Sequence, residues 1–335
     1  MRDMERKSQL SWWGRQSLCK RVTLILVPVV VVVGLAVGLG VGLAVGKDSD
    51  GESSPSPTGP FPTSTSPPGT LWQPKVNSTW QIILSNPLDL SPDATSVDPD
   101  VSIYDIDLYD NSQEIIDTLH RLDKKVICYF SAGSYEPNRP DSDDFAEDDL
   151  GLELDGWPGE MWLKLGSENV RSIMKKRIAL AGSKRCDAID PDNVDGYQNE
   201  NGLNLTAEDS IDFMRFLAKE AADHGLSIGL KNALNIIENV LNITHFSVNE
   251  QCAEYDECED FTPFITAGKP VFHIEYPEDV PNVASNVRSE LCQSAGNAEY
   301  EQGFSTVLKN MDLDGWVQFC DGSIAETALD TPNSD

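Results

Sequence analysis

The stretch that decides the predicted fold is residues 168–233, ENVRSIMKKRIALAGSKRCDAIDPDNVDGYQNENGLNLTAEDSIDFMRFLAKEAADHGLSIGLKNA. Within it, residues 168–180 and 207–224 carry the apolar spacing of amphipathic helices. Residues 186–193 and 226–233 are short apolar runs that end in polar side chains, which is typical of buried strands. Because helices and strands alternate, the stretch predicts parallel strands joined by helical crossovers.

The same alternation continues on both sides of this stretch. Six further apolar runs are candidate strands, and they begin at Trp80, Val101, Lys125, Glu160, Phe246 and Pro270. Eight strands within residues 72–325 predict a (β/α)₈ TIM barrel, which typically needs about 250 residues. An open doubly wound sheet would also alternate, but no GxGxxG or GxxxxGK[ST] loop follows any of these strands. Residues 297–320 are expected to form the last helix and a closing segment.

The N-terminal part of the chain is not globular. Residues 22–46 carry no charge over 25 positions, which is long enough to cross the ~30 Å hydrocarbon core of a bilayer as a helix. A cleaved signal peptide would have an apolar region of only ~7 to 15 residues. Basic residues precede the apolar run, so we expect residues 1–21 in the cytoplasm and the rest outside, as in a single-pass type II membrane protein.

The segments that flank the predicted domain lack apolar content. Residues 47–71 are rich in Ser, Thr and Pro, and we expect a disordered linker there, followed after the domain by a disordered tail at 326–335. Six of the seven cysteines lie in the predicted extracellular part, where disulfides form. We predict the pairs Cys252–Cys258 and Cys292–Cys320, whereas Cys128 and Cys186 are either paired or buried thiols. Three sequons on the same side are predicted glycosylation sites, at Asn77, Asn204 and Asn242.

The charge of the chain is strongly acidic. The formal net charge is −30, although residues 1–21 carry six basic side chains against two acidic ones. An acidic surface repels nucleic acid and attracts a cationic polymer, although it also simply keeps a secreted protein soluble. We therefore expect no nucleic-acid partner. We also expect a monomer, with the membrane contacted through one helix.

Carboxylates gather at the ends of the predicted strands. In a (β/α)₈ barrel these ends form the active site, and glycoside hydrolysis needs one acid to protonate the leaving oxygen and a second carboxylate to attack or to activate water. We take Asp192 and Glu250 as the leading catalytic pair, because their strands lie two apart. The candidate binding residues at other strand ends and in the loops are Asp105, Asp107, Tyr129, Ser131, Asn193, Lys231, Asn232 and Glu275, with Tyr197 and Trp157 suited to stacking on sugars.

Other chemistries are less well supported by the sequence. Acidic and amide side chains can also bind calcium or magnesium, but the sequence has no twelve-residue calcium loop. Its four histidines form no HExxH motif, and it contains no GxSxG nucleophile elbow. We therefore expect no metal and no cofactor.

Six segments together resemble the catalytic domain of glycoside hydrolase family 114. They are WQIILSNP (80–87), YDIDLYD (104–110), VICYFSAGSYEPNRPD (126–141), CDAIDPDNVDGYQN (186–199), GLKNA (229–233) and FSVNEQC (246–252). The resemblance spans about residues 72–276. It implies a (β/α)₈ fold and endo-α-1,4-polygalactosaminidase activity on galactosamine-containing polymers such as galactosaminogalactan.

The resemblance also implies roles for particular residues. The family's proposed catalytic carboxylates correspond to Asp192 and Glu250. Many relatives carry glutamate before the PDN sequence where this chain has Asp190, so Asp190 is a third catalytic candidate. A cationic or partly acetylated galactosamine polymer would suit the acidic outer domain. Two alternatives stay open: a cell-surface protein that binds such a polymer without cutting it, and a barrel glycosidase for another sugar polymer.

Overall fold

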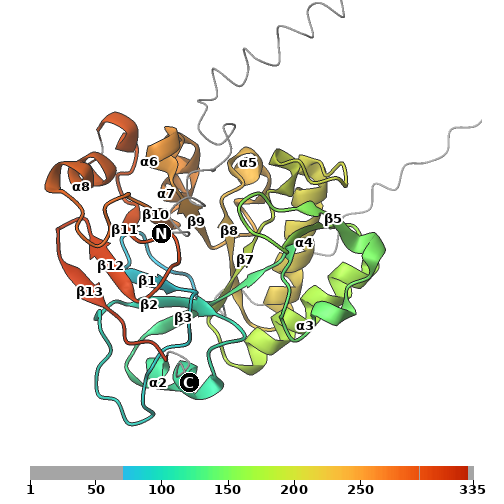
Figure 1. Cartoon of the computed structure of the whole chain (residues 1–335), viewed down its shortest axis with the longest axis horizontal. Coiled ribbons are helices and arrows are strands. Elements are labelled where there is room, and N and C mark those ends of the chain that lie inside the picture. Colours follow the sequence, from blue (N-terminus) through green and yellow to red (C-terminus); the bar gives the residue numbers. More distant parts are fainter. Residues whose placement is uncertain (1–70, 294, 331–335) are drawn as a thin grey trace, which may run out of the picture. The chain divides into compact units, whose positions relative to one another are not determined.

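The computed structural model describes residues 71–293 and 295–330 (Figure 1). The predicted cytoplasmic tail, membrane helix and linker lie outside the described residues, apart from residue 71. Residues 331–335 of the predicted tail also lie outside them. Among the helices that are described, none is long and apolar enough to cross a membrane.

Eight parallel strands form the body of the fold, in the order β1-β2-β3-β7-β8-β9-β10-β11. Their bounds are β1 Trp80–Ile83, β2 Ile103–Asp107, β3 Lys125–Ser131, β7 Ala188–Asp192, β8 Ser227–Lys231, β9 Phe246–Glu250, β10 Val271–Glu275 and β11 Ser305–Leu308. Most are short, almost fully buried segments, as expected for a parallel sheet covered on both faces.

Two antiparallel strands extend this sheet beyond β11. They are β12 Trp316–Phe319 and β13 Ile324–Glu326. The first and the last parallel strands, β1 and β11, are joined by side chains: the Trp80 indole donates to the Ser305 carbonyl at 2.7 Å, and the Ser305 hydroxyl donates to the Ser78 carbonyl at 2.7 Å. The sheet is therefore barrel-like, and Figure 1 shows β1 lying next to β11 and β12.

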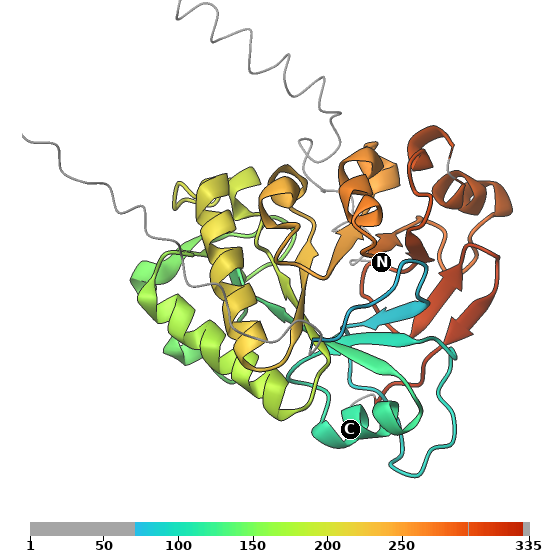
Figure 2. The same cartoon turned by 180° about the vertical axis from the view of Figure 1, so that it is seen from behind.

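Helices cover the outside of the curled sheet. The α-helices are α2 Gln113–Arg121, α3 Glu168–Ser183, α4 Ala207–Asp223, α5 Ile237–Val240, α6 Cys252–Tyr255, α7 Thr262–Thr266 and α8 Ser285–Cys292. The long helices α3 and α4 lie side by side on the outer face, as Figure 2 shows. Thr206 caps α4 in a capping box with Asp209, which satisfies backbone N–H groups at the first turn.

The strand predicted at Glu160 is wrong as a barrel strand. The structure places β6 (Met161–Leu163) in a separate antiparallel sheet with β4 (Ser134–Tyr135) and β5 (Leu150–Glu153). A short apolar run has the same appearance in either kind of sheet, so periodicity could not separate them. The eighth parallel strand is instead β11.

The last helix predicted within residues 297–320 is wrong, because β11 forms there, whereas the predicted closing segment corresponds to β12, which pairs with β11. The 297–320 stretch holds only part of a short 3₁₀ turn, η6 (Gly296–Ala298), before these strands. Folding also continues past the predicted boundary at residue 325, because Asp89 N–H donates to the Ala328 carbonyl and Asp330 N–H to the Pro87 carbonyl.

Two apolar cores stabilise this arrangement. The larger lies between the strands and the surrounding helices, and the smaller fills the inside of the barrel with side chains such as Trp80, Phe246 and Phe272. Gly229 makes room for Phe246, because a Cβ there would lie 2.4 Å from the phenyl ring. Side chains at the base of the barrel are thus apolar, which leaves the strand ends as the place for polar chemistry.

Three disulfides connect the elements. The predicted pairs Cys252–Cys258 and Cys292–Cys320 are confirmed, and the open case Cys128–Cys186 is also a disulfide. It links β3 to the residue two positions before β7. All three sequon asparagines are exposed, and their glycosylation stays a prediction.

Candidate active site

Two carboxylates and one lysine meet at the carboxyl ends of three adjacent strands. Asp192 ends β7, Lys231 ends β8 and Glu250 ends β9. The Lys231 ammonium lies 3.2 Å from Asp192 Oδ2 and 3.5 Å from Glu250 Oε2. The structure thus brings together the leading predicted pair, with a buried cation between them.

Further donors hold both carboxylates in place. Asp192 accepts hydrogen bonds from the Tyr129 hydroxyl at 2.9 Å and from the Asn193 backbone N–H at 2.7 Å. Glu250 accepts one from the Asn232 side-chain amide at 3.0 Å and a short one from the Tyr276 hydroxyl. Donors to the ionised form stabilise a carboxylate, so both groups are fixed in position before substrate arrives.

The backbone turns sharply after each of the three strand ends. Asn193, Asn232 and Gln251 follow Asp192, Lys231 and Glu250 directly, and each has a left-handed φ, of 60°, 47° and 62°. Asparagine accepts this conformation more readily than most residues, and glutamine less so. The repeated turn leaves the last side chain of each strand at the rim of the barrel.

A close backbone contact supports the turn after β7. A Cβ on Gly133 would lie 1.8 Å from the Asn193 carbonyl oxygen, so only glycine fits there. The Asn193 side chain donates to the hydroxyls of Ser131 and Ser134 at 3.0 Å and 3.1 Å. Ser131 and Asn193 therefore stabilise the β7 turn, and their role in substrate binding stays a prediction.

Lys231 keeps its positive charge although its side chain is only 2% exposed. Burial disfavours the ammonium, but the carboxylates of Asp192, Glu250 and Asp190 outweigh it and hold the pKa of Lys231 above its ordinary value. The lysine also lies over the Tyr129 ring, 5.4 Å from its centroid. The site thus combines two usable carboxylates with one permanent cation.

Two acids that the sequence analysis did not select also influence this site. Burial, followed by the charge of Asp192, raises the pKa of Asp195 to about 7. Burial and the neighbouring Glu136 raise the pKa of Glu160 to about 7. Asp195 lies in the CDAIDPDNVDGYQN motif and could have been chosen for that reason, whereas Glu160 comes from the strand that was misplaced.

Three predicted sugar-binding acids are almost fully buried. Asp105 is fully buried inside the barrel, below the catalytic pair. Asp107 is 1% exposed and pairs with Arg139 at 2.8 Å. Glu275 is 1% exposed, pairs with His273 at 2.8 Å and accepts a hydrogen bond from Ala253 N–H. The sequence correctly predicted that the three acids lie at or near strand ends, but it did not predict the partners of Asp107 and Glu275.

The remaining candidates differ in position. Asp190, the third catalytic candidate, is fully buried two residues before Asp192 on β7. Tyr197 is partly buried and accepts a hydrogen bond from Gln198. Trp157 lies in the β5–β6 hairpin and is 55% exposed, so it is available for stacking. Tyr276, which the sequence analysis left out of the site, contacts Glu250 directly.

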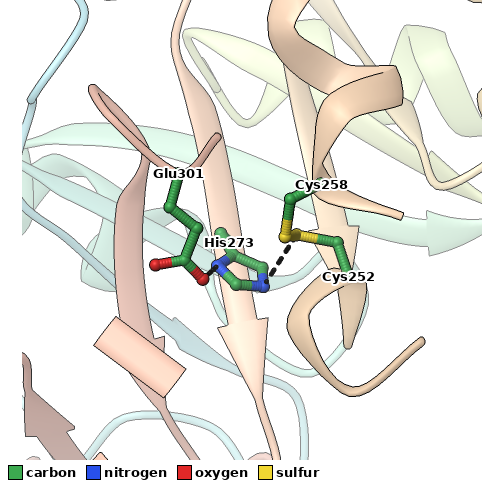
Figure 3. A group of neighbouring side chains, drawn as sticks. All are labelled: Cys252, Cys258, His273 and Glu301. Atoms are coloured by element: carbon green, nitrogen blue, oxygen red, sulfur yellow. Dashed lines mark hydrogen bonds and ion pairs between the residues drawn. A yellow bond between two sulfur atoms is a disulfide. The ribbon is translucent and has the colours of Figure 1, made fainter. Parts of the chain in front are cut away.

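His273 forms a buried charged cluster behind the loop that follows Glu250 (Figure 3). Its Nε2 lies 2.8 Å from Glu275 and 3.4 Å from Cys252 Sγ, and its Nδ1 lies 3.2 Å from Glu301. Burial opposes protonation, but the two glutamates raise the pKa of His273 to about 9. The imidazolium therefore links β10 to the segments before β11 and after β9.

The same cluster offers a group of atoms that could hold a metal ion. Cys252, Cys258, His273 and Glu301 each have a ligand atom within 4.8 Å of the others. The two sulfurs are joined in a disulfide, so neither is a thiolate. Figure 3 also shows Glu301 on the Nδ1 side of the ring and the sulfurs on the Nε2 side, so one imidazole cannot serve a single ion between them. We interpret the cluster as structural.

Replacing His273 with glutamine is expected to destabilise the protein at pH 6 by about 3–5 kcal/mol, because it leaves Glu275 and Glu301 buried without a cation. The folded-state pKa is raised, so the stabilisation is complete below the ordinary value of about 6.5 and is lost as the pH rises through about 9. Denaturant unfolding at pH 6 and pH 10 measures this. An equal destabilisation at both values would contradict the charged state of His273.

The chain is similar to one sequence family and to solved structures of sugar-processing proteins. The model of the glycoside-hydrolase family GH114 matches residues 62–325. Ega3 of Aspergillus fumigatus, solved in complex with galactosamine, is 50% identical with a TM-score of 0.69, over 74% of this chain and 97% of Ega3. The glycoside hydrolase domain of PelA from Pseudomonas aeruginosa shares the fold, with 13% identity and a TM-score of 0.52 over 70% of this chain and 96% of that domain.

No curated protein sequence matches the chain. The family match nevertheless covers well over half of the residues, and the similarity to Ega3 spans nearly all of that structure. The resemblance found in the six sequence segments is therefore confirmed. The protein belongs to the glycoside-hydrolase family GH114 and is a glycoside hydrolase.

Proposed function

We propose that the protein is an endo-acting hydrolase of α-1,4-linked galactosamine polymers such as galactosaminogalactan. The observation that carries this proposal is the Asp192–Lys231–Glu250 arrangement at the barrel mouth, in a chain that is 50% identical to a protein solved with galactosamine. Hydrolysis needs two carboxylates facing one glycosidic bond, and this pair meets that requirement.

The spacing of the pair favours a retaining mechanism. Both carboxylates contact the same ammonium, so their nearest oxygens are separated by no more than the sum of 3.2 Å and 3.5 Å. This maximum separation of about 6.7 Å is close to the shortest distance in the ~6.5–9.5 Å range of inverting enzymes. It is compatible with the ~5–5.5 Å separation that is typical of retaining enzymes.

Asp192 suits the nucleophile, because Tyr129, Lys231 and a backbone N–H all donate to its ionised form. Its oxygen attacks the anomeric carbon while Glu250 gives a proton to the leaving oxygen and the glycosidic bond breaks. Glu250 then takes a proton from water, which attacks the same carbon and releases Asp192. Proton NMR of the first products is expected to show the α anomer; initial formation of the β anomer would exclude this mechanism.

Acidic side chains around the pair support a cationic substrate. A hollow of about 580 Å³ adjoins Tyr276 and is lined by Glu254, Glu275, Glu278 and Glu290. Asp195 and Glu160 also interact electrostatically with Asp192. A chain of ammonium sugars is attracted to such surroundings, and acetylated units lose that attraction.

A panel of polymers tests the substrate. We expect the purified protein to release oligosaccharides from galactosaminogalactan, faster after chemical deacetylation, and none from chitosan or from an uncharged α-galactan. Cleavage of chitosan at an equal rate would show that the site selects charge but not galactosamine. Binding of every polymer without cleavage would favour the non-catalytic alternative.

Trp157 is proposed as a stacking platform away from the cleavage point. Replacing Trp157 with alanine is expected to raise KM for the long polymer about tenfold, because a sugar–aromatic contact contributes about 1–1.5 kcal/mol. kcat and the KM for short oligosaccharides stay unchanged. The matched control is Leu152→Ala, an equally exposed apolar residue on the same hairpin. Equal effects on long and short substrates would contradict this role.

We also propose that residues 22–46 anchor the chain in the cell membrane, with residues 1–21 in the cytoplasm and a glycosylated domain outside. The uncharged apolar run and the basic cluster before it support this topology. Protease treatment of intact cells is expected to remove the domain, and a peptide N-glycosidase to increase its mobility on a gel. A domain protected in intact cells would contradict it.

A further inference from the structure

Two aspartates lie inside the barrel directly below the catalytic carboxylates. Asp105 on β2 and Asp190 on β7 are both fully buried. Within the part of the chain that the structure describes, none of their four carboxylate oxygens has a hydrogen-bond donor. Buried polar atoms without partners are rare and costly, so this arrangement needs a chemical explanation.

The surroundings of the two aspartates contain one cation and several anions. Asp190 interacts electrostatically with Lys231 on β8, with Asp192 on its own strand and with Glu250 on β9. The strongest electrostatic interaction of Asp105 is with Asp190, followed by those with Lys231 and Asp192. The neighbouring group on β3 is the Tyr129 hydroxyl, which donates to Asp192. Lys231 is thus shared among up to four carboxylates.

Four ionised carboxylates around one ammonium cannot be accommodated in a buried site. Like charges disfavour a second ionisation, and burial disfavours each one separately. A proton on one aspartate supplies an O–H donor for the other, which satisfies the oxygens that have no partner. The apolar layer below the pair, which includes Ile103 and Ala188, offers no other donor.

We infer that Asp105 and Asp190 form a hydrogen-bonded acid pair that retains a proton and sets the charge beneath Asp192, Lys231 and Glu250. Asp105 and Asp190 are then positioning residues that never touch the sugar. The catalytic consequence rests on the proposed function, but the existence of the pair does not.

The proton affinities of the two groups agree with this assignment. Burial, and then the charge of Asp190, raises the pKa of Asp105 well above its ordinary value. Burial raises the pKa of Asp190 to about 7, against the opposing effect of Lys231. The pair is therefore neutral in acid and acquires one negative charge near neutral pH, directly below Lys231.

Thermal unfolding of the full-length protein tests the pair without an activity assay. Because the pKa of Asp190 is higher in the folded than in the unfolded state, its proton stabilises the fold fully below about pH 4, and this stabilisation is lost as the pH rises through about 7. In Asp190→Asn the group does not ionise, so the protein does not lose this stability at higher pH. The difference in Tm between variant and wild type is expected to rise by about 5 °C from pH 4.5 to pH 8.5.

Two further variants show whether the aspartates act as a unit. In Asp105→Asn the amide donates to Asp190, so Asp190 ionises at lower pH and the fall in Tm moves to lower pH. The double variant is expected to match Asp190→Asn in its pH dependence, because the aspartates share one titration. Asp148→Asn, an exposed aspartate, is the control and leaves the pH dependence unchanged.

Carbon-13 NMR of aspartate carboxyls in the wild-type protein covers the case in which the variants do not fold. At least one aspartate signal besides that of Asp195, whose pKa is also raised to about 7, is expected to stay protonated at pH 6, where ordinary aspartates are ionised. The inference is overturned if no more than one aspartate signal stays protonated at pH 6, or if Asp190→Asn shifts Tm equally at all pH values.

Kinetics then connect the pair to catalysis. The carboxylate of Asp190 interacts electrostatically with Glu250, the proposed proton donor, and Asp190→Asn removes that charge. Asp190→Asn is therefore expected to move the alkaline limb of kcat/KM down by about one pH unit, and the kcat at the optimum to fall far less than in Asp192→Asn. If the Tm and NMR results hold but this limb does not move, the acid pair exists without the catalytic effect. Absence of any hydrolysis by wild type rejects the proposed function alone.

Discussion

Replacing Asp192 with asparagine, or Glu250 with glutamine, is expected to lower kcat on the galactosamine polymer by at least about 10³-fold. Each amide keeps the size of the acid and can still accept a hydrogen bond, so folding is preserved while the chemistry is removed. Reducing-end release measures the loss. The exposed acids Asp148 and Glu147, replaced in the same way, serve as controls and retain activity.

The two variants are expected to differ in how they can be rescued. Without Glu250 the leaving group receives no proton, so a substrate with an acidic leaving group restores the first step in Glu250→Gln. Without Asp192 the nucleophile is missing, and added azide restores turnover of Asp192→Ala by attacking the anomeric carbon itself. If the pattern of rescue is reversed, the two roles are exchanged. If both amide variants stay active, the pair is not catalytic.

Replacing Lys231 with methionine is expected to have the second largest effect. The ammonium is buried between Asp192 and Glu250, and methionine keeps the volume of the stem but removes the charge. We expect kcat/KM to fall about 10²-fold or more and the protein to lose about 2–4 kcal/mol of stability, because both carboxylates lose the cation that lies between them.

The pH dependence separates an electrostatic role of Lys231 from a purely structural one. Without the cation the nucleophile holds its proton more tightly, so the acid limb of kcat/KM in Lys231→Met is expected to move to higher pH by about one unit. A variant that loses stability but keeps the wild-type acid limb would show that Lys231 only fills space. Lys164→Met, a lysine outside the site, is the matched control.

Much of the fold could be predicted from the sequence, because its strands are buried on both faces. Runs such as 226–233 are mostly apolar, and the helices on either side of the 186–193 run are amphipathic, so the sequence predicts alternating helices and parallel strands. The strand at Glu160 was misplaced because three apolar residues look the same in a hairpin as in a barrel. β11 escaped notice because STVL is short and lies beside loop-like sequence.

The site was predicted less evenly. Asp192, Lys231 and Glu250 end consecutive strands, and the alternation of side chains makes them converge. Asp107 and Glu275 also lie at strand ends, where they form ion pairs with Arg139 and His273. The spacing of residues in the sequence does not predict either ion pair. Asp190 and Asp192 lie two residues apart on β7, so both side chains face the barrel interior. The groups that lie beside Asp190 depend on strand register, which pairs Tyr129 with Asp190 and Ser131 with Asp192.

The most direct test of the account is digestion of a defined α-1,4-galactosamine polymer in ¹⁸O-labelled water, followed by mass spectrometry of the products. Hydrolysis at internal bonds predicts a ladder of short oligosaccharides, each with one labelled oxygen at its new reducing end, and no ladder with Asp192→Asn or Glu250→Gln. A polymer that binds the wild-type protein but stays at full length would contradict the central claim.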